Sequence, residues 1–132
     1  MSATARPFLM FQKHDAEEAM RFYVSLFSGG EVLEIARWGP GEPGQEGSVK
    51  RATFRIAGQT VMCSDSPVKH GFDFTPSVSL FVDCESEEEL KRLAQKLSEN
   101  GAVLMPVGNY GFSRQFTWCN DRFGVSWQIN LP

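Results

Sequence analysis

Two stretches of the chain, Asp15–Val32 and Ser86–Val103, decide the fold because they share one pattern. The first reads Asp15-Ala-Glu-Glu-Ala-Met-Arg-Phe-Tyr-Val-Ser-Leu-Phe-Ser-Gly-Gly-Glu-Val32, and the second reads Ser86-Glu-Glu-Glu-Leu-Lys-Arg-Leu-Ala-Gln-Lys-Leu-Ser-Glu-Asn-Gly-Ala-Val103. Each begins with a capping residue followed three positions later by Glu, continues as an apolar stripe at helical spacing and ends at glycine. The apolar positions correspond at a spacing of 71 residues, as Ala19 does to Leu90. Each stretch therefore predicts a helix that leads into a strand.

The segments around these helices predict the same strands in the same order in both halves. Apolar runs and alternation predict strands at residues 8–11, 31–38, 49–56, 59–64, 77–82, 102–107, 112–118 and 125–131. Gly58 and Gly124 mark the last hairpin of each half, 66 residues apart. The predicted fold class is α+β, with tandem βαβββ modules. Residues 1–132 form one domain, with module 1 at about 1–66 and module 2 at about 75–132.

Composition and charge exclude several classes of protein. An apolar fraction of 42% in 132 residues suits one globular domain. Thirteen basic against sixteen acidic residues give a net charge of −3, so no basic face for a nucleic acid is expected. No apolar run approaches the roughly 20 residues that cross a membrane. Three widely spaced cysteines and the lack of a signal-peptide pattern predict a reduced, cytoplasmic protein.

Three short stretches resemble a known superfamily, and the resemblance covers almost the whole chain. They are Asp15-Ala-Glu-Glu-Ala-Met-Arg-Phe-Tyr23 with Phe27, Gly58-Gln59, and Asp121-Arg-Phe-Gly-Val-Ser-Trp-Gln-Ile129. The sequence resembles the vicinal oxygen chelate superfamily, which includes glyoxalase I, extradiol dioxygenases and bleomycin-resistance proteins. Within it, the chain is most similar to the PhnB-like branch, described as 3-demethylubiquinone-9 3-methyltransferase-like. The resemblance implies a cup-shaped mixed sheet backed by helices, a ligand on its concave face, and a homodimer.

Strand alternation supports a ligand-binding face independently. Successive strand residues point to opposite sides. One side is apolar in the strands at 8–11, 59–64, 77–82 and 125–131, as a helix-covered face should be. The other side mixes Phe and Met with polar residues, which suits a pocket with a few orienting groups, although a partly solvated sheet face gives the same pattern. Expected walls are Phe8, Met10, Met62 and Trp118, and expected orienting groups are Gln12, Ser77, Ser79 and Gln128.

The superfamily's metalloenzymes bind a divalent ion through His and Glu or Gln on the first and last strands of each module. The corresponding positions of this chain are Phe8, Met62, Ser77 and Gln128. Phe cannot coordinate an ion, a thioether is a poor ligand for hard cations, and only Gln128 offers a good oxygen. We therefore predict no metal site and no cofactor. The glycines of segment 39–47 precede no helix, which argues against a phosphate-binding loop.

Other candidates for chemistry are few. Arg114 shares strand parity with aromatic residues, so it is either an anion anchor in the cup or an edge-strand arginine. His14 and His70 belong to no recognisable catalytic arrangement. Cys119 follows a strand beside a turn and is the cysteine expected to be most accessible.

Three hypotheses remain open at this point. The first is a metal-free, cup-shaped protein that binds a small, partly aromatic or apolar molecule. The second is a metal-dependent lyase, isomerase or dioxygenase of the same superfamily with non-standard ligands. The third is a dimeric scaffold whose surplus aromatic residues form an interface. Whether the protein turns over a substrate stays open, because fold similarity alone does not confer function.

Overall fold

The computed structural model describes residues 2–132 and contains two compact units. The first unit ends at Asp73, and the second runs from Phe74 to Pro132. Each unit has a four-stranded sheet and one helix in the order βαβββ, which confirms the α+β fold class and the internal repeat. Within residues 2–132, no helix combines the length and the apolar character needed to cross a membrane.

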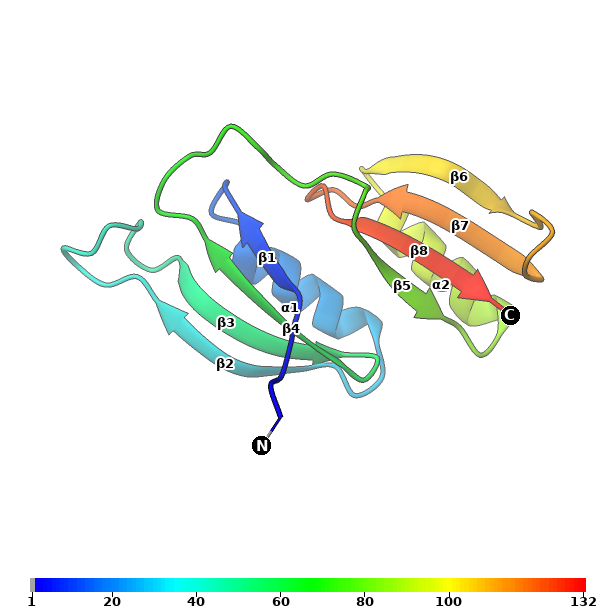
Figure 1. The fold of residues 1–132 in the computed structure, drawn as a ribbon, viewed down its shortest axis with the longest axis horizontal. Helices are drawn as coiled ribbons and strands as arrows, with labels where there is room; N and C mark the ends of the chain where they lie inside the picture. The colour runs from blue at the N-terminus through cyan, green and yellow to red at the C-terminus, as the bar shows by residue number, and fades with distance from the viewer. Residues whose placement is uncertain (1) are drawn as a thin grey trace. The chain divides into compact units, whose positions relative to one another are not determined.

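The first unit has strand order β1-β4-β3-β2, with β1 parallel to β4 and the other neighbours antiparallel (Figure 1). Its elements are β1 (Phe8–Phe11), α1 (Ala16–Leu26), β2 (Glu31–Arg37), β3 (Val49–Ile56) and β4 (Gln59–Asp65). The second unit has the equivalent order β5-β8-β7-β6, with β5 parallel to β8. Its elements are β5 (Ser79–Asp83), α2 (Glu87–Ser98), β6 (Ala102–Gly108), β7 (Gln115–Asn120) and β8 (Ser126–Leu131).

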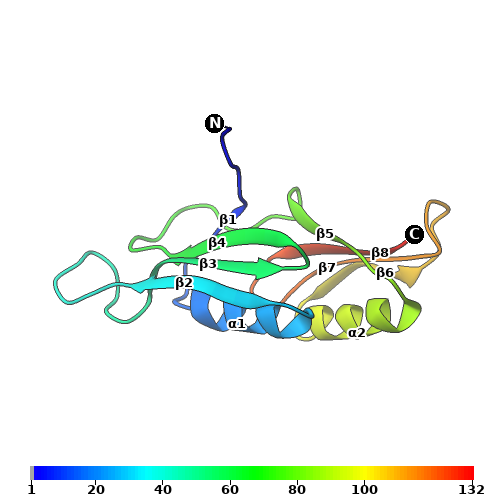
Figure 2. The same ribbon diagram turned by 90° about the horizontal axis from the view of Figure 1, so that it is seen from below.

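In each unit the helix covers one face of the sheet, as Figure 2 shows for α1 and α2. The predicted stripe of α2 is buried in full, at Leu90, Leu93, Ala94 and Leu97. On α1 the buried residues are Ala16, Ala19, Met20, Tyr23 and Leu26. The strands contribute the alternate apolar residues that the sequence predicts, including Val61, Cys63, Trp127 and Ile129. The opposite face of each sheet carries no helix of its own unit and is called the open face below.

A buried carboxylate, Asp65, holds the first unit together at the end of β4. One oxygen accepts the N–H of Ala16 at 3.0 Å and the other accepts the N–H of Val49 at 2.8 Å. Its backbone carbonyl accepts the Trp38 indole N–H at 3.1 Å. Asp15 stands at the N-cap position of α1, but its side chain makes no capping hydrogen bond, so the predicted capping role is wrong for Asp15. The N–H group at the start of α1 is instead bound by Asp65, the last residue of β4.

The second unit has a corresponding buried carboxylate, Asp121, at the turn between β7 and β8. One oxygen accepts the N–H groups of Phe123 and Val125, and the other accepts the Trp127 indole N–H at 2.9 Å. The α2 cap follows the sequence prediction, because the Ser86 hydroxyl accepts the N–H of Glu89 at 3.1 Å. The Asp121 carboxylate thus joins the final turn to the largest side chain of the core.

Two predicted strands begin two or three residues later in the structure than the sequence predicts. β5 begins at Ser79 instead of residue 77, because residues 76–78 form a turn and bend that leave Val78 80% exposed. β7 begins at Gln115 instead of residue 112, since residues 111–114 bend within the β6–β7 connection. Phe112 is apolar and was predicted as a strand residue, but its ring contacts those of Tyr110 and Phe116 instead.

Replacing the Asp65 carboxylate tests its role. We expect Asp65→Ala to lower the free energy of unfolding by about 3 kcal/mol, because two hydrogen bonds to a buried charged acceptor are lost. Chemical denaturation of the variant and the parent measures the difference. Glu46→Ala, which removes an exposed carboxylate, is the control and should change stability by less than about 0.5 kcal/mol. Equal stability of the two variants would contradict this role.

Candidate ligand-binding faces

The open face of the first unit changes from apolar to charged across its strands. Strand pairing places Phe8 beside Met62, and Met62 beside Thr53. Met10 of β1 lies opposite Ser64 in the same way. Farther across the sheet, two ion pairs join β3 to β2: Arg51 with Glu34 at 3.9 Å and Arg55 with Glu31 at 3.3 Å. The part of this face that suits an apolar ligand therefore lies over β1 and β4.

The open face of the second unit is built from three rows of paired residues. From β6 through β7 and β8 to β5 the rows are Ala102, Asn120, Ser126 and Ser79; Met105, Trp118, Gln128 and Phe81; and Gly108, Phe116, Asn130 and Asp83. They are called the Ser126 row, the Gln128 row and the Asn130 row. Paired residues point to the same side of a sheet, so each row presents its side chains together.

The Gln128 row places an amide between two aromatic rings. Trp118 is the cross-strand partner of Gln128 on one side, and Phe81 is its partner on the other. Gln128 is half-buried, and Phe81 is 55% exposed. Among the described residues of the second unit, the Gln128 side chain has no hydrogen-bond partner. The amide N–H groups and the amide oxygen of Gln128 are therefore free to hydrogen-bond a ligand, and the apolar surface of Phe81 and Trp118 lies on either side of them.

The Ser126 row contains a directed chain of hydroxyl groups. The Trp118 indole N–H donates to the Ser126 hydroxyl oxygen at 2.8 Å, and this oxygen lies 2.7 Å from the Ser79 hydroxyl oxygen. Ser126 is 1% exposed, so its own hydrogen requires an acceptor within the protein. Either hydroxyl can donate across the Ser126–Ser79 pair. When Ser126 donates, the half-buried Ser79 hydroxyl keeps its hydrogen for an outside partner.

Three of the predicted site residues lie outside the strands that form the open faces. Gln12 follows β1, where its amide donates to the Phe72 carbonyl at 2.6 Å and accepts the His70 N–H at 2.6 Å. Ser77 lies before β5, with its hydroxyl 2.7 Å from that of Thr75. Arg114 precedes β7 and donates from Nε to the Pro132 carbonyl at 2.7 Å, so the parity argument for it does not apply.

The other six predicted residues lie on open-face strands. Phe8, Met10 and Met62 belong to the first unit, and Ser79, Trp118 and Gln128 belong to the second. Strand alternation in the sequence puts Phe81 on the side of Ser79 and Asn130 on the side of Gln128, but neither was predicted as a site residue. The sequence prediction missed Asp83 and Asn120, because its strands ended at residues 82 and 118. Continuing the alternation to the true strand ends would have found both.

The residues at the superfamily's metal positions do not fit a hard divalent ion. Phe8 and Met62 are cross-strand partners, so the first unit offers a ring and a thioether. The β5 residue opposite Gln128 is Phe81 rather than the expected Ser77, which leaves one amide oxygen in the second unit. Among residues 2–132, the structure groups no three His, Cys, Asp or Glu side chains that could hold a metal ion.

The three cysteine thiols are buried and free. Cys119 is 1% exposed, so the expectation that it is accessible is wrong. It lies on the helix-covered side of β7, opposite Trp127. Burial raises the pKa of Cys63 to about 12 and the pKa of Cys84 and Cys119 to about 11, with nearby carboxylates adding to each shift. The thiols therefore belong to the core and are not activated nucleophiles.

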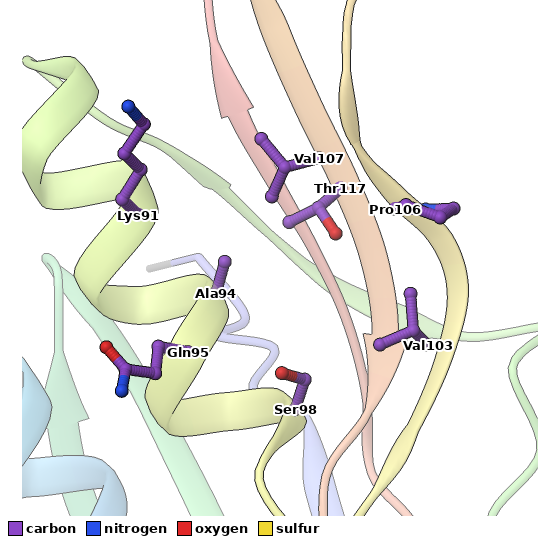
Figure 3. A pocket seen from close by; sticks show the side chains of 8 residues that line it. All are labelled: Lys91, Ala94, Gln95, Ser98, Val103, Pro106, Val107 and Thr117. Atoms are coloured by element: carbon purple, nitrogen blue, oxygen red, sulfur yellow. The ribbon is translucent and has the colours of Figure 1, made fainter.

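A separate groove lies on the helix side of the second unit, between α2 and β6 (Figure 3). Its volume is about 380 Å³. Its lining is Lys91, Ala94, Gln95, Ser98, Val103, Pro106, Val107 and Thr117. The one ionisable side chain in this lining, Lys91, forms an ion pair with Glu87 at 3.1 Å. The groove thus offers apolar surface and few groups for orienting a ligand, unlike the open face.

The repeated βαβββ units give the chain the fold of solved glyoxalase/bleomycin resistance/dioxygenase-domain proteins. The chain belongs to the 3-demethylubiquinone-9 3-methyltransferase family, whose model matches residues 3–130. This confirms the resemblance seen in the sequence. The PhnB protein from Bacillus cereus is 51% identical, with a TM-score of 0.94 over 98% of this chain and 100% of that one.

Other relatives are more distant. Protein YjdN of Escherichia coli (strain K12) is 32% identical over 84 residues, which cover 64% of this chain and 56% of YjdN. The chain thus spans a little over half the length of that curated relative. PA1353 from Pseudomonas aeruginosa is 27% identical with a TM-score of 0.86, each chain being covered to 98%. FosX from Listeria monocytogenes, solved with Mn(II) and a dihydroxypropylphosphonic acid, is 14% identical with a TM-score of 0.66, covering 98% of this chain and 92% of its own. FosX shares the fold.

Thiol reactivity tests the assignment of the cysteines to the core. A thiol whose pKa is raised to about 11 is only about one part in a thousand thiolate at pH 8, and burial also blocks the reagent. We expect no reaction of the folded protein with Ellman's reagent at pH 8 over an hour. The protein unfolded in guanidinium chloride should release the signal of all three thiols. Rapid modification of one thiol in the folded protein would contradict this assignment.

Proposed function

We propose that the protein binds a small organic molecule, with an aromatic or apolar body, on the open faces of its sheets and without a metal ion. The observation that carries this proposal is the uncommitted Gln128 amide between Trp118 and Phe81. Ligand sites combine mostly apolar walls with a few polar groups that fix orientation. The two rings supply wall area, and the amide offers one acceptor and two N–H donors.

The neighbouring hydroxyl chain supports the same function. With Ser126 donating to Ser79, the Ser79 hydroxyl is a donor held at a fixed place beside the Gln128 row. Its partner is the Ser126 hydroxyl, not a histidine or carboxylate that could activate it as a nucleophile. The first unit has an apolar pair of its own, Phe8 and Met62, on its open face. These groups favour binding over bond-breaking chemistry.

Methyl transfer, which the family's description names, requires a methyl donor. The glycine-rich segment 39–47 connects β2 to β3, so no helix N-terminus follows it. Helix N-termini are where glycine-rich loops hold phosphate or dinucleotide groups. We therefore keep the proposal at ligand binding and do not extend it to methyl transfer.

Two further expectations accompany this proposal. A homodimer is supported by β6, an edge strand whose Val103, Leu104 and Val107 are each at least 40% exposed. A cytoplasmic location is supported by the three free thiols, since reduced cysteines suit a reducing compartment.

A ligand screen with a matched pair of variants tests the proposal. We expect aromatic metabolites or antibiotics to raise the melting temperature, because a ligand of the folded state stabilises it. For the tightest hit, Gln128→Leu should weaken binding roughly tenfold through lost hydrogen bonds, while preserving volume and fold. Gln95→Leu, the same change on exposed α2, should leave the dissociation constant unchanged.

The same assay separates the metal-dependent alternative. Binding in excess EDTA should equal binding in buffer, as measured by isothermal titration calorimetry. A hit that needs a divalent ion, and loses both ion and ligand in Gln128→Leu, would overturn metal-free binding. A hit equally tight in the parent and in Gln128→Leu would move the site away from the Gln128 row.

A further inference from the structure

Four aromatic rings, one of which is Phe81 of the Gln128 row, form a cluster in the second unit. Phe116 of β7 is 3% exposed and lies beneath the others. Its ring centroid is 4.9 Å from Phe112, 6.2 Å from Tyr110 and 6.3 Å from Phe81. Phe81 and Phe112 remain 55% and 61% exposed, and Tyr110 is 42% exposed. The cluster is thus one buried ring with three rings around it that still face outward.

The β6–β7 connection is fixed by its own hydrogen bonds. The Tyr110 hydroxyl donates to the Pro106 carbonyl at 2.5 Å, and the Asn109 side chain accepts the N–H of Gly111 at 2.8 Å. Gly111 has φ of +98°, a conformation that favours glycine. Arg114, at the end of the connection, is tied to Pro132. The exposed rings are therefore held in position before any ligand arrives, which lowers the entropy cost of binding.

A carboxylate lies next to this cluster on the same face. Asp83 is two residues after Phe81 on β5, so both side chains point to the open side. In the Asn130 row, Asn130 is the cross-strand partner of both Asp83 and Phe116. The Asn130 amide donates to one Asp83 oxygen at 2.9 Å. This bond orients the carboxylate, and the exposed Asp83 presents its other oxygen to solvent.

The Asn130 row also contains an acceptor without a donor. A carboxylate only accepts, so the Asn130 NH₂ group must face Asp83 and the amide oxygen must face away from it. That oxygen is buried and has no hydrogen-bond partner among the described residues, and Asn130 as a residue is 6% exposed. Because it points away from Asp83, the negative charge that a ligand can reach in this row is the carboxylate of Asp83. The faces of the aromatic rings in the cluster also carry a negative electrostatic potential.

We propose that the Asn130 row and the aromatic cluster bind the cationic group of an organic amine. This inference rests on the proposed function and names its ligand class. The ammonium group lies against Asp83 and the ring faces, since a cation is attracted by aromatic faces and by a carboxylate. The apolar body of the amine extends over Phe81 toward Trp118 and Gln128. A neutral molecule gains only the apolar part of this interaction, and an anion is repelled by Asp83.

Three small probes of nearly equal size test the charge preference: benzylamine, benzyl alcohol and benzoate. Chemical shifts of the ¹⁵N-labelled full chain at pH 7 report binding and its location. We expect benzylamine to bind about tenfold more tightly than benzyl alcohol, and benzoate more weakly than both. The shifts should involve Phe81, Asp83 and the β6–β7 connection.

Two variants with matched controls separate the parts of the site. Asp83→Asn should remove the preference for benzylamine over benzyl alcohol, whereas Glu99→Gln, the same neutralisation at the exposed end of α2, should preserve it. Phe112→Leu should weaken benzylamine several-fold, and Phe72→Leu, an exposed ring of the first unit, should not. Heteronuclear spectra of all four variants verify folding.

The outcomes distinguish this inference from the proposed function. Equal affinity for benzylamine and benzyl alcohol at the Gln128 row, unchanged in Asp83→Asn, would overturn the amine site and leave ligand binding intact. Shifts from none of the three probes anywhere on the open face would count against both. A change of oligomeric state in Phe112→Leu, with the probe affinities unchanged, would assign the cluster to a protein interface and overturn the amine site.

Discussion

Two buried carboxylates, Asp65 and Asp121, fix the geometry on which the open faces depend. Burying a carboxylate is costly unless strong donors surround it, and each of these receives N–H groups from more than one element. Asp65 is also the cross-strand partner of Phe11, at the end of the β1–β4 pairing that sets Phe8 opposite Met62. Asp121 holds the turn between β7 and β8, which sets the pairing of Trp118 with Gln128. The rows of each open face follow from these registers.

The helix-covered face of each sheet fixes the strand register, and this leaves the open face free to carry other side chains. A strand register that slips by one residue exchanges the faces, so the apolar residues under α1 and α2 enforce the register. Residues such as Val61 and Trp127 are fully buried there. The alternate positions are then free to hold groups that a core would not tolerate. An uncommitted amide beside two rings, as at Gln128, is such a group.

The sequence predicted the features that depend on local residue patterns, namely strands and the buried faces of helices. The alternation of segment 49–56 and the stripe of Leu90, Leu93 and Leu97 gave β3 and the buried face of α2. It did not predict contacts between residues far apart in the chain. The capping of α1 by Asp65 joins residues 49 positions apart, and the amide of Gln12 binds a segment about 60 positions away. The β6–β7 connection also escaped prediction, because Phe112 has strand propensity but packs on Phe116.

The equivalent positions of the two units carry related chemistry. Opposite the last strand of each unit stands a phenylalanine, Phe8 beside Met62 and Phe81 beside Gln128. These side chains can offer dispersion contacts and one amide, so the ligand binding that we propose would depend on the shape and polarity of the ligand. Its affinity would then come from apolar area and from a few charged or polar contacts at the edge of that area. Asp83, next to Phe81 on β5, is placed to make such a contact.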